Sequence, residues 1–200
     1  LFSLGFYHPA DNLWKDFPNS TVSGTMLHSS VTLSDNKIYN FGGIKQDGNT
    51  TNELWTFNPS GGAWEQKTSL PGSGRYGHTS FVYNGKMYVW GGHDGSNVSN
   101  EMWSYDATQN SWSQEQQRNA PPGRTLAASA AQGNLLWVFG GEGTGGSELK
   151  DVWEYDLTSR SWLQKSDLSA SLTESAAIAL PGRAARILVF GGKSSGMPVN

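Results

Sequence analysis

The sequence predicts an all-β protein made of repeats of about 50 residues, each folded as four antiparallel strands. The first observation is a Gly-Gly pair that occurs four times. Its first glycines stand at positions 42, 91, 140 and 191, so successive pairs are 49, 49 and 51 residues apart. The second observation is a short aromatic and β-branched run before each pair, and the third is two tryptophans, nine residues apart, after each of the first three pairs. Such regularity is typical of proteins that stack one structural unit on the next.

The run before each Gly-Gly pair is the predicted second strand of its repeat. These runs cover residues 37–41, 86–90, 135–139 and 186–190 and are bounded by turn-forming residues. A third strand is expected after a polar loop, over residues 52–57, 100–105 and 150–155. Because side chains alternate along a strand, one face of this strand carries Leu54, Met102 or Val152. The opposite face carries an acid and a tryptophan: Glu53 and Trp55, Glu101 and Trp103, Asp151 and Trp153.

The fourth strand contains the second tryptophan, and the first strand returns into the second through a tight turn. Asn84-Gly85 is the strongest of these turn signals, because both residues tolerate a positive φ. The first strands are predicted within residues 27–33, 77–83, 126–131 and 173–180. Residues 126–132 and 168–180 are rich in Ala and Ser and would locally favour a helix, but their place in the repeat predicts strands.

Four-stranded units of this kind, arranged radially, form a β-propeller whose blades cover one another's faces. We predict a single propeller domain, or a segment of one, over residues 1–200. Half blades are placed at 3–17 and 173–192, and complete blades at about 25–66, 75–114 and 124–164. The first half blade holds the third and fourth strands of a repeat, and the last holds the first and second strands, so together they would make one blade. Two arrangements therefore stay open: an arc of a larger ring, or a four-bladed ring closed by the half blades.

The best-preserved repeat resembles the kelch repeat. Residues 74–92 read Gly-Arg-Tyr-Gly-His-Thr-Ser-Phe-Val-Tyr-Asn-Gly-Lys-Met-Tyr-Val-Trp-Gly-Gly, followed by Asn-Glu-Met-Trp-Ser-Tyr-Asp at 100–106 and Ser-Trp at 111–112. Arg75 and Arg124 match the arginine that starts the family's first strand, whereas Gly24 and Leu172 replace it in other copies. The resemblance covers nearly the whole chain. It implies a kelch-type propeller of six or seven blades that binds proteins, which favours the arc.

Residues that recur in the repeats are interpreted as structural. The tryptophans are expected in the core between blades, at Trp14, Trp55, Trp64, Trp103, Trp112, Trp153 and Trp162. The Gly-Gly pairs are expected to supply unusual φ angles and room for a neighbouring aromatic ring. His28 and His78 recur in register, which predicts a structural hydrogen bond. The recurring acids indicate a buried network rather than acid catalysis, because identical positions in successive blades do not converge on one substrate.

Composition excludes several classes of function. A net charge of −3 offers no electrostatic case for nucleic acid or an anionic membrane, and no apolar run is long enough to span a bilayer. The chain has no Cys, which excludes disulfides and the Cys-linked copper site of galactose-oxidase-like relatives. We predict no metal, no cofactor and no enzymatic activity. Sequons at Asn19, Asn49 and Asn97 keep an extracellular location open, whereas the resemblance favours the cytoplasm.

The candidate binding surface is the end of the propeller where the loops vary most. Loops 44–51, 93–99, 142–149 and 193–200 share this end with the connections 66–74, 114–123 and 164–171, because antiparallel strands alternate in direction. Variable loops on a fixed scaffold are where binding usually occurs. The hypothesis is a protein-interaction scaffold or adaptor, and the alternative is an extracellular glycan-binding or structural propeller. The candidate binding residues are Lys45, Asp47, Arg75, Tyr76, His93, Asp94, Arg124, Glu142 and Lys150.

Overall fold

The structure, a computed structural model, describes residues 4–10, 12–17, 24–182 and 186–199. It is all-β, and a 3₁₀ turn at Thr144–Gly146 is the sole helical element of the described residues. Residues 3 and 183–185, which belong to the predicted half blades, and the sequon residue Asn19 lie outside the described residues. The described side chains also do not include that of Trp14, so its predicted core position is not addressed.

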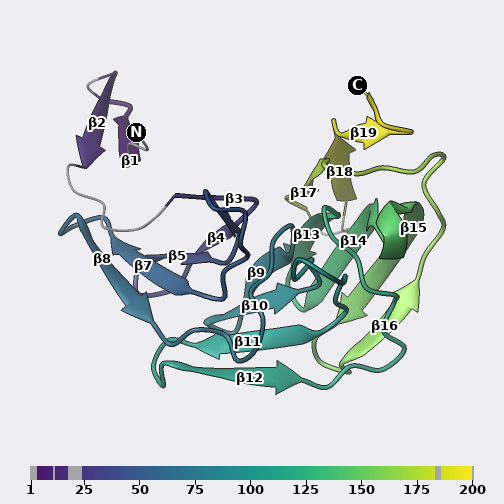
Figure 1. Cartoon of the computed structure of the whole chain (residues 1–200), viewed down its shortest axis with the longest axis horizontal. Coiled ribbons are helices and arrows are strands. Elements are labelled where there is room, and N and C mark those ends of the chain that lie inside the picture. The colour runs from purple at the N-terminus through teal and green to yellow at the C-terminus, as the bar shows by residue number, and fades with distance from the viewer. Residues whose placement is uncertain (1–3, 11, 18–23, 183–185, 200) are drawn as a thin grey trace.

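Three antiparallel four-stranded sheets form the body of the described chain, and in each of them the strands follow one another in sequence order. The first contains β4 (Ser29–Thr32), β5 (Ile38–Phe41), β7 (Leu54–Asn58) and β8 (Ala63–Lys67). The second contains β9 (Thr79–Tyr83), β10 (Lys86–Trp90), β11 (Met102–Asp106) and β12 (Ser111–Glu115). The third contains β13 (Ala128–Gln132), β14 (Leu135–Glu142), β15 (Glu148–Asp156) and β16 (Ser161–Gln164). Figure 1 shows these blades, here called blades 1, 2 and 3, following one another around an arc.

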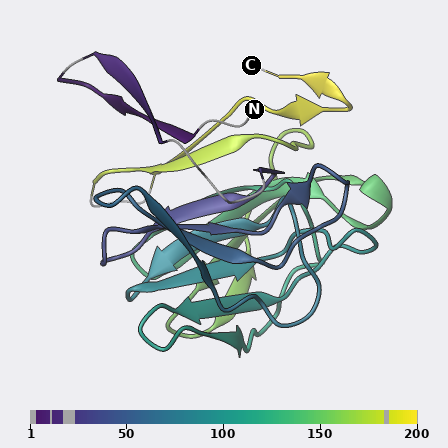
Figure 2. The same ribbon diagram turned by 60° about the vertical axis from the view of Figure 1, so that its left-hand side comes forward.

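Hairpins lie at both ends of the arc. β1 (Leu4–His8) pairs with β2 (Leu13–Phe17), and β17 (Ala176–Leu180) pairs with β18 (Arg186–Phe190). The two hairpins are separate two-stranded sheets, so the four-bladed ring closed by the half blades is not formed (Figures 1 and 2). Two short pairs complete the described strands: β3 (Thr25–Met26) with β6 (Ile44–Lys45), and β19 (Lys193–Ser194) with β20 (Met197–Pro198).

Both Ala- and Ser-rich segments contain a strand, as their place in the repeat predicted, although in 168–180 the strand covers only Ala176–Leu180. β13 and β17 are the first strands of their blades, and β13 contacts both β9 and β17. The tight turn at Asn84-Gly85 has φ angles of 47° and 74°, which suit a two-residue hairpin turn. Repeat position therefore outweighed the local helix propensity of alanine, because the segment gains pairing partners only as a strand.

Backbone hydrogen bonds join each blade to the next near the first strands. The Gly43 N–H donates to the Arg75 carbonyl, and the Gly92 N–H donates to the Arg124 carbonyl, each at 2.8 Å. In a second set of such bonds, the Gly77 N–H donates to the Leu27 carbonyl at 2.9 Å, and the Leu126 N–H donates to the Gly77 carbonyl at 2.8 Å. These bonds fix how closely the blades approach, since both partners are main-chain atoms.

The first glycine of each of the first three Gly-Gly pairs is required by this close approach. Gly42 has a φ of +68°, and a Cβ built on it would lie 2.6 Å from the Arg75 carbonyl oxygen of the next blade. A Cβ on Gly140 would lie 2.3 Å from the Leu172 carbonyl oxygen. The unusual φ was predicted correctly. The expectation of a neighbouring aromatic ring was mostly wrong. At the first glycine of each of these three pairs, a main-chain carbonyl of the next blade fills the space.

The apolar core consists of clusters between successive blades. Tyr39 and Phe41 of blade 1 pack against Met87 and Val89 of blade 2 in one cluster. A second cluster joins blades 2 and 3, and a third joins blade 3 to the inner face of β17–β18. Each blade is therefore stabilised by its neighbours, as repeat proteins require.

The tryptophans are less buried than the sequence analysis expected. Trp162 is fully buried at 2% exposure, whereas Trp103, Trp112 and Trp153 pack partly buried on the cluster edges. The third-strand indoles stay near the surface because their N–H groups donate to the acid two residues earlier, as in the 3.1 Å bond from Trp103 to Glu101. Trp90 and Trp137, outside the predicted set, are buried instead.

Candidate functional site

Two adjacent pockets open among the variable loops. The first, the Arg75 pocket, has a volume of about 420 Å³ and is lined by Pro71, Gly72, Ser73, Arg75, Asp94, Asn97, Val98, Ser99, Asn100, Glu101 and Trp103. The second, the Tyr76 pocket, has a volume of about 390 Å³ and is lined by Tyr76, His93, Ser96, Asn97, Val98, Thr125, Leu126, Glu142, Gly143, Thr144, Gly145 and Gly146. Asn97 and Val98 line both pockets, so the loop 93–99 separates them. The connection 66–74 and the loop 93–99 thus meet at one end of the blades.

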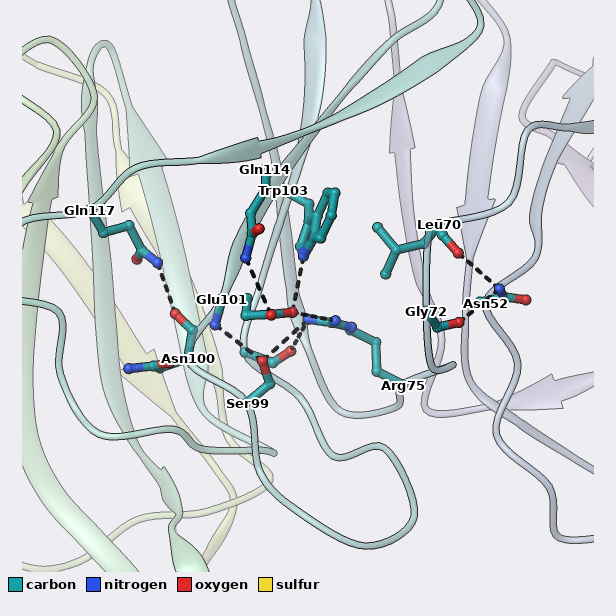
Figure 3. Close-up of polar contacts among 11 residues, drawn as sticks. Asn52, Leu70, Gly72, Arg75, Ser99, Asn100, Glu101, Trp103, Gln114 and Gln117 are labelled. Carbon is teal, nitrogen blue, oxygen red and sulfur yellow. Dashed lines mark hydrogen bonds and ion pairs between the residues drawn. The ribbon is translucent and has the colours of Figure 1, made fainter.

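An ion pair at the back of the Arg75 pocket belongs to the architecture of blade 2. The Arg75 Nη2 lies 3.0 Å from the Glu101 Oε2, and its Nη1 donates to the Gly91 carbonyl at 3.3 Å (Figure 3). Trp103 and Gln114 donate to the same carboxylate at 3.1 and 3.2 Å. Burial alone would raise the pKa of Glu101, but the hydrogen bonds from Trp103 and Arg75 outweigh it and lower that pKa. Glu101 is therefore an ionised structural partner of Arg75.

Blade 3 repeats this arrangement with an aspartate. The Arg124 guanidinium bonds both carboxylate oxygens of Asp151, one of them through Nη2 at 2.9 Å, and Trp153 donates to the same carboxylate at 2.6 Å. The Arg124 side chain is fully buried. Bidentate Arg–carboxylate pairs of this kind are strong and directional. The predicted network of the recurring acids is thus present in both blades.

Blade 1 has no arginine at this position, and a loop lysine replaces it. Thr25 pairs with Lys45 and Met26 with Ile44, just as Tyr76 pairs with His93 in blade 2. Thr25 is therefore the equivalent of Arg75, which corrects the assignment to Gly24. The Lys45 Nζ reaches the Glu53 Oε1 at 2.7 Å and supplies the missing positive charge.

The nine candidate residues therefore separate into groups with different surroundings. Arg75 and Arg124 are buried in their own blades, and Lys45 is paired within blade 1, so these three cations are already used by the scaffold. Arg75, Asp94, Tyr76, His93 and Glu142 line the two pockets. Asp47 and Lys150 are exposed outside both pockets, where Asp47 accepts a hydrogen bond from the Asn49 N–H and Lys150 pairs with Asp167.

Asp94 shapes the loop between the pockets. Its Oδ1 accepts hydrogen bonds from the backbone N–H groups of Ser96 and Asn97, at 2.8 and 2.7 Å. These bonds lower the pKa of Asp94, since they favour the charged carboxylate. Asn97 and Val98 border both pockets, but neither was among the nine candidate binding residues. Their position in a loop after a Gly-Gly pair was the available signal.

The three blades, their shared network and the loop pockets define a repeat β-propeller of the kelch type. The chain belongs to the KLHDC2/KLHL20/DRC7 Kelch-repeats domain family, which matches residues 3–192. This result confirms the resemblance seen in residues 74–92 and the predicted all-β propeller fold. Kelch domains are in general protein-interaction propellers, and this chain shares that general class.

Individual relatives share shorter stretches with the chain. An N-acetylneuraminate epimerase of Shigella sonnei is 37% identical over 73 residues, covering 34% of this chain and 20% of the relative. Alpha-scruin of Limulus polyphemus is 28% identical over 98 residues, covering 46% of this chain and 10% of scruin. The solved structure of YjhT superposes with a TM-score of 0.79 at 22% identity, over 91% of this chain and 63% of that one. The matches thus span only a minor part of the curated relatives and less than two thirds of YjhT.

The repeats led to the prediction that the chain has no enzymatic activity, and this prediction is wrong. Relatives with 36–37% identity over the matched residues are N-acetylneuraminate epimerases, so proteins built from this repeat do include enzymes. The reasoning failed because a repeat pattern identifies the scaffold, and one scaffold can carry both binding sites and catalytic sites.

Proposed function

We propose that the propeller, with complete blades at about 25–66, 75–114 and 124–164, is a scaffold or adaptor that binds an extended segment of a partner protein across the two loop pockets. The observation that carries the proposal is the loop 93–99, whose Asn97 and Val98 line both pockets. A segment crossing this loop would place neighbouring side chains in two separate pockets. Extended segments are commonly recognised in this way, by a row of pockets on a rigid surface.

The rigidity of the surroundings supports this proposal. Tyr76 and His93 exchange two backbone hydrogen bonds, at 3.0 and 2.9 Å, and Thr125 and Glu142 do the same at 2.9 and 2.8 Å. The Arg75–Glu101 pair fixes the back of the first pocket. A partner would therefore meet preformed pockets, which lowers the entropy lost on binding.

A charged side chain at the loop between the pockets tests this function. We expect Asn97→Arg to reduce the binding of peptides selected on the wild-type protein from a random phage-displayed library by about tenfold or more, a loss of about 1.4 kcal/mol. Gln109→Arg is the matched control, because Gln109 is exposed in the β11–β12 turn and lines neither pocket. Equal binding to Asn97→Arg and wild type, or the absence of any selected peptide, would contradict the proposal.

The epimerase match favours a carbohydrate as the second candidate ligand. N-acetylneuraminate is the sugar named by the relatives, and the pocket linings offer hydroxyl and amide groups such as Ser73, Ser96 and Asn100. Asn49 and Asn97, the described sequon residues, are exposed. Titration with N-acetylneuraminate, followed by saturation-transfer NMR and by the rate of its epimerisation, tests this candidate. A signal from the wild-type protein, together with the absence of any selected peptide, would favour the sugar over the peptide.

A further inference from the structure

The Tyr76 pocket contains a stacked aromatic pair. The rings of Tyr76 and His93 have centroids 5.2 Å apart and planes inclined by 32°. Their main chains are bridged to each other, so the rings are carried on a fixed backbone. Within the described part of the chain the Tyr76 hydroxyl makes no hydrogen bond. The pair therefore offers an aromatic surface and a free hydroxyl group to a ligand.

A backbone hydrogen bond orients the imidazole of His93. The Gly95 N–H donates to His93 Nδ1 at 2.9 Å, so this nitrogen acts as an acceptor inside its own loop. His93 thus presents a ring face in a fixed orientation to the pocket.

Glu142 differs from the three recurring acids of the blades. Glu53, Glu101 and Asp151 each have a cationic partner and an indole donor. The Glu142 main chain is bonded to Thr125 in both directions, yet its carboxylate has no hydrogen bond or ion pair with any described residue. Neither Lys nor Arg lines the Tyr76 pocket. Its carboxylate is therefore free to pair with a cation from outside.

The adjoining pocket adds to the negative potential. Its lining contains Asp94 and Glu101 against a single cation, Arg75, which is already bonded to Glu101. The Asp94 carboxylate is ionised and, among the described residues, accepts hydrogen bonds only from backbone N–H groups. Over both pockets the carboxylates outnumber Lys and Arg by three to one, so an anionic ligand is disfavoured and a cationic one is attracted.

We propose that the Tyr76 pocket takes a Lys or Arg side chain of the partner segment, with its charge at Glu142 and its aliphatic stem along the Tyr76 and His93 rings. An ion pair and an aromatic face are the two groups that recognise such a side chain. The inference rests on the proposed binding of a partner segment and specifies its chemistry. Arg75 and Arg124 are candidate binding residues from the sequence, but both guanidinium groups are paired with carboxylates inside their blades.

Selection from a random phage-displayed peptide library tests the inference. Peptides selected on the wild-type protein should be enriched in Lys or Arg. They should bind Glu142→Gln about threefold to tenfold more weakly, as for a partly exposed ion pair. Their affinity should also fall with added salt. The control is Glu65→Gln, which removes an exposed carboxylate on the outer strand β8 and should leave binding unchanged.

The outcomes separate this inference from the proposed function. Peptides that lose binding to Asn97→Arg, yet lack basic residues or bind Glu142→Gln as well as wild type, would overturn the inference and leave segment binding in place. Peptides that bind Asn97→Arg as tightly as wild type would overturn both the inference and the proposed segment binding. Basic peptides that bind Glu142→Gln and Glu65→Gln equally weakly would indicate attraction to net charge rather than to the pocket, and would also overturn the inference.

Discussion

Phe139 and Phe190 occupy the same place in successive repeats, immediately before a Gly-Gly pair, but their surroundings differ. Phe139 is 7% exposed, because β17–β18 covers this face of blade 3. Phe190 is 55% exposed, and Ile178 and Leu188 are exposed on the same outer face of β17–β18. A Cβ on Gly140 would meet the next main chain at 2.3 Å, whereas one on Gly191 would meet nothing within 4 Å. The phenylalanine and the first glycine of the motif are therefore constrained only where a following blade packs on them.

The largest expected effect is the loss of a covered phenylalanine. Phe139→Ala should lower the free energy of unfolding by about 3–5 kcal/mol, since it removes a buried aromatic and leaves a cavity between blade 3 and β17–β18. Phe190→Ala should change it by about 0.5 kcal/mol or less, as for an exposed site. Urea denaturation of both variants measures the difference. Equal losses would mean that the outer face of β17–β18 is covered in solution.

The buried arginine of blade 3 provides the next test. Arg124→Leu introduces the residue that naturally stands at position 172. It should destabilise the protein by about 3 kcal/mol, because Asp151 loses the partner of its largely buried carboxylate. The double variant Arg124→Leu/Asp151→Leu should recover part of that loss. If the single variant melts at the wild-type temperature, the pair does not stabilise the blade.

Alanine substitutions of the two first glycines should lower the stability in the same order as those of the two phenylalanines. Gly140→Ala combines a positive φ with a main-chain clash and should cost about 2–3 kcal/mol. Gly191→Ala has the positive φ but open space, and should cost about 1 kcal/mol. Thermal unfolding of the two variants under identical conditions checks the ranking. A larger loss for Gly191→Ala would reverse the comparison.

A histidine pair extends the comparison to the other end of the arc. His78 is buried against Ser29 and Phe41 of blade 1, with its ring nitrogen 2.6 Å from the Ser29 hydroxyl, whereas His28 is exposed. Burial, reinforced by the charge of Arg75, lowers the pKa of His78 from 6.5 to about 3. Because the unfolded chain binds this proton below pH 6.5 and the folded chain does not, stability should fall as the pH drops from 6.5 toward 3.

The expected loss from His78 is about 2 kcal/mol between pH 7.5 and pH 5. Urea denaturation at the two pH values measures it, and His78→Gln should remove most of this pH dependence. His28→Gln, at the exposed equivalent position, is the matched control and should keep the wild-type dependence. An unchanged pH profile in His78→Gln would show that other groups cause the acid sensitivity.

Much of the local structure was predictable because it depends on short-range patterns. The Gly-Gly period located the second strands. The strand alternation correctly put Leu54, Met102 and Val152 on one face, and the structure shows that this face is buried. β13 was predicted against its alanine content because its register matched the other first strands. The candidate site was predicted only in part. Tyr76, His93 and Glu142 were candidates from the sequence and line one pocket, whereas the pairing of Arg75, Arg124 and Lys45 within their own blades makes these cations part of the scaffold.

The sequence by itself determined the strand order within each blade, the turns, and the loops that meet at one end, because these follow from residue spacing and backbone preference. Only the tertiary structure decided which charges are free. An arginine can bind a partner only if no carboxylate of its own blade pairs with it. That depends on residues about 26 positions away, as with Arg75 and Glu101. The covering of Phe139 and the exposure of Phe190 likewise depend on the neighbouring blade. Repeat position specifies a residue's place within its blade, but contacts between blades determine its chemistry.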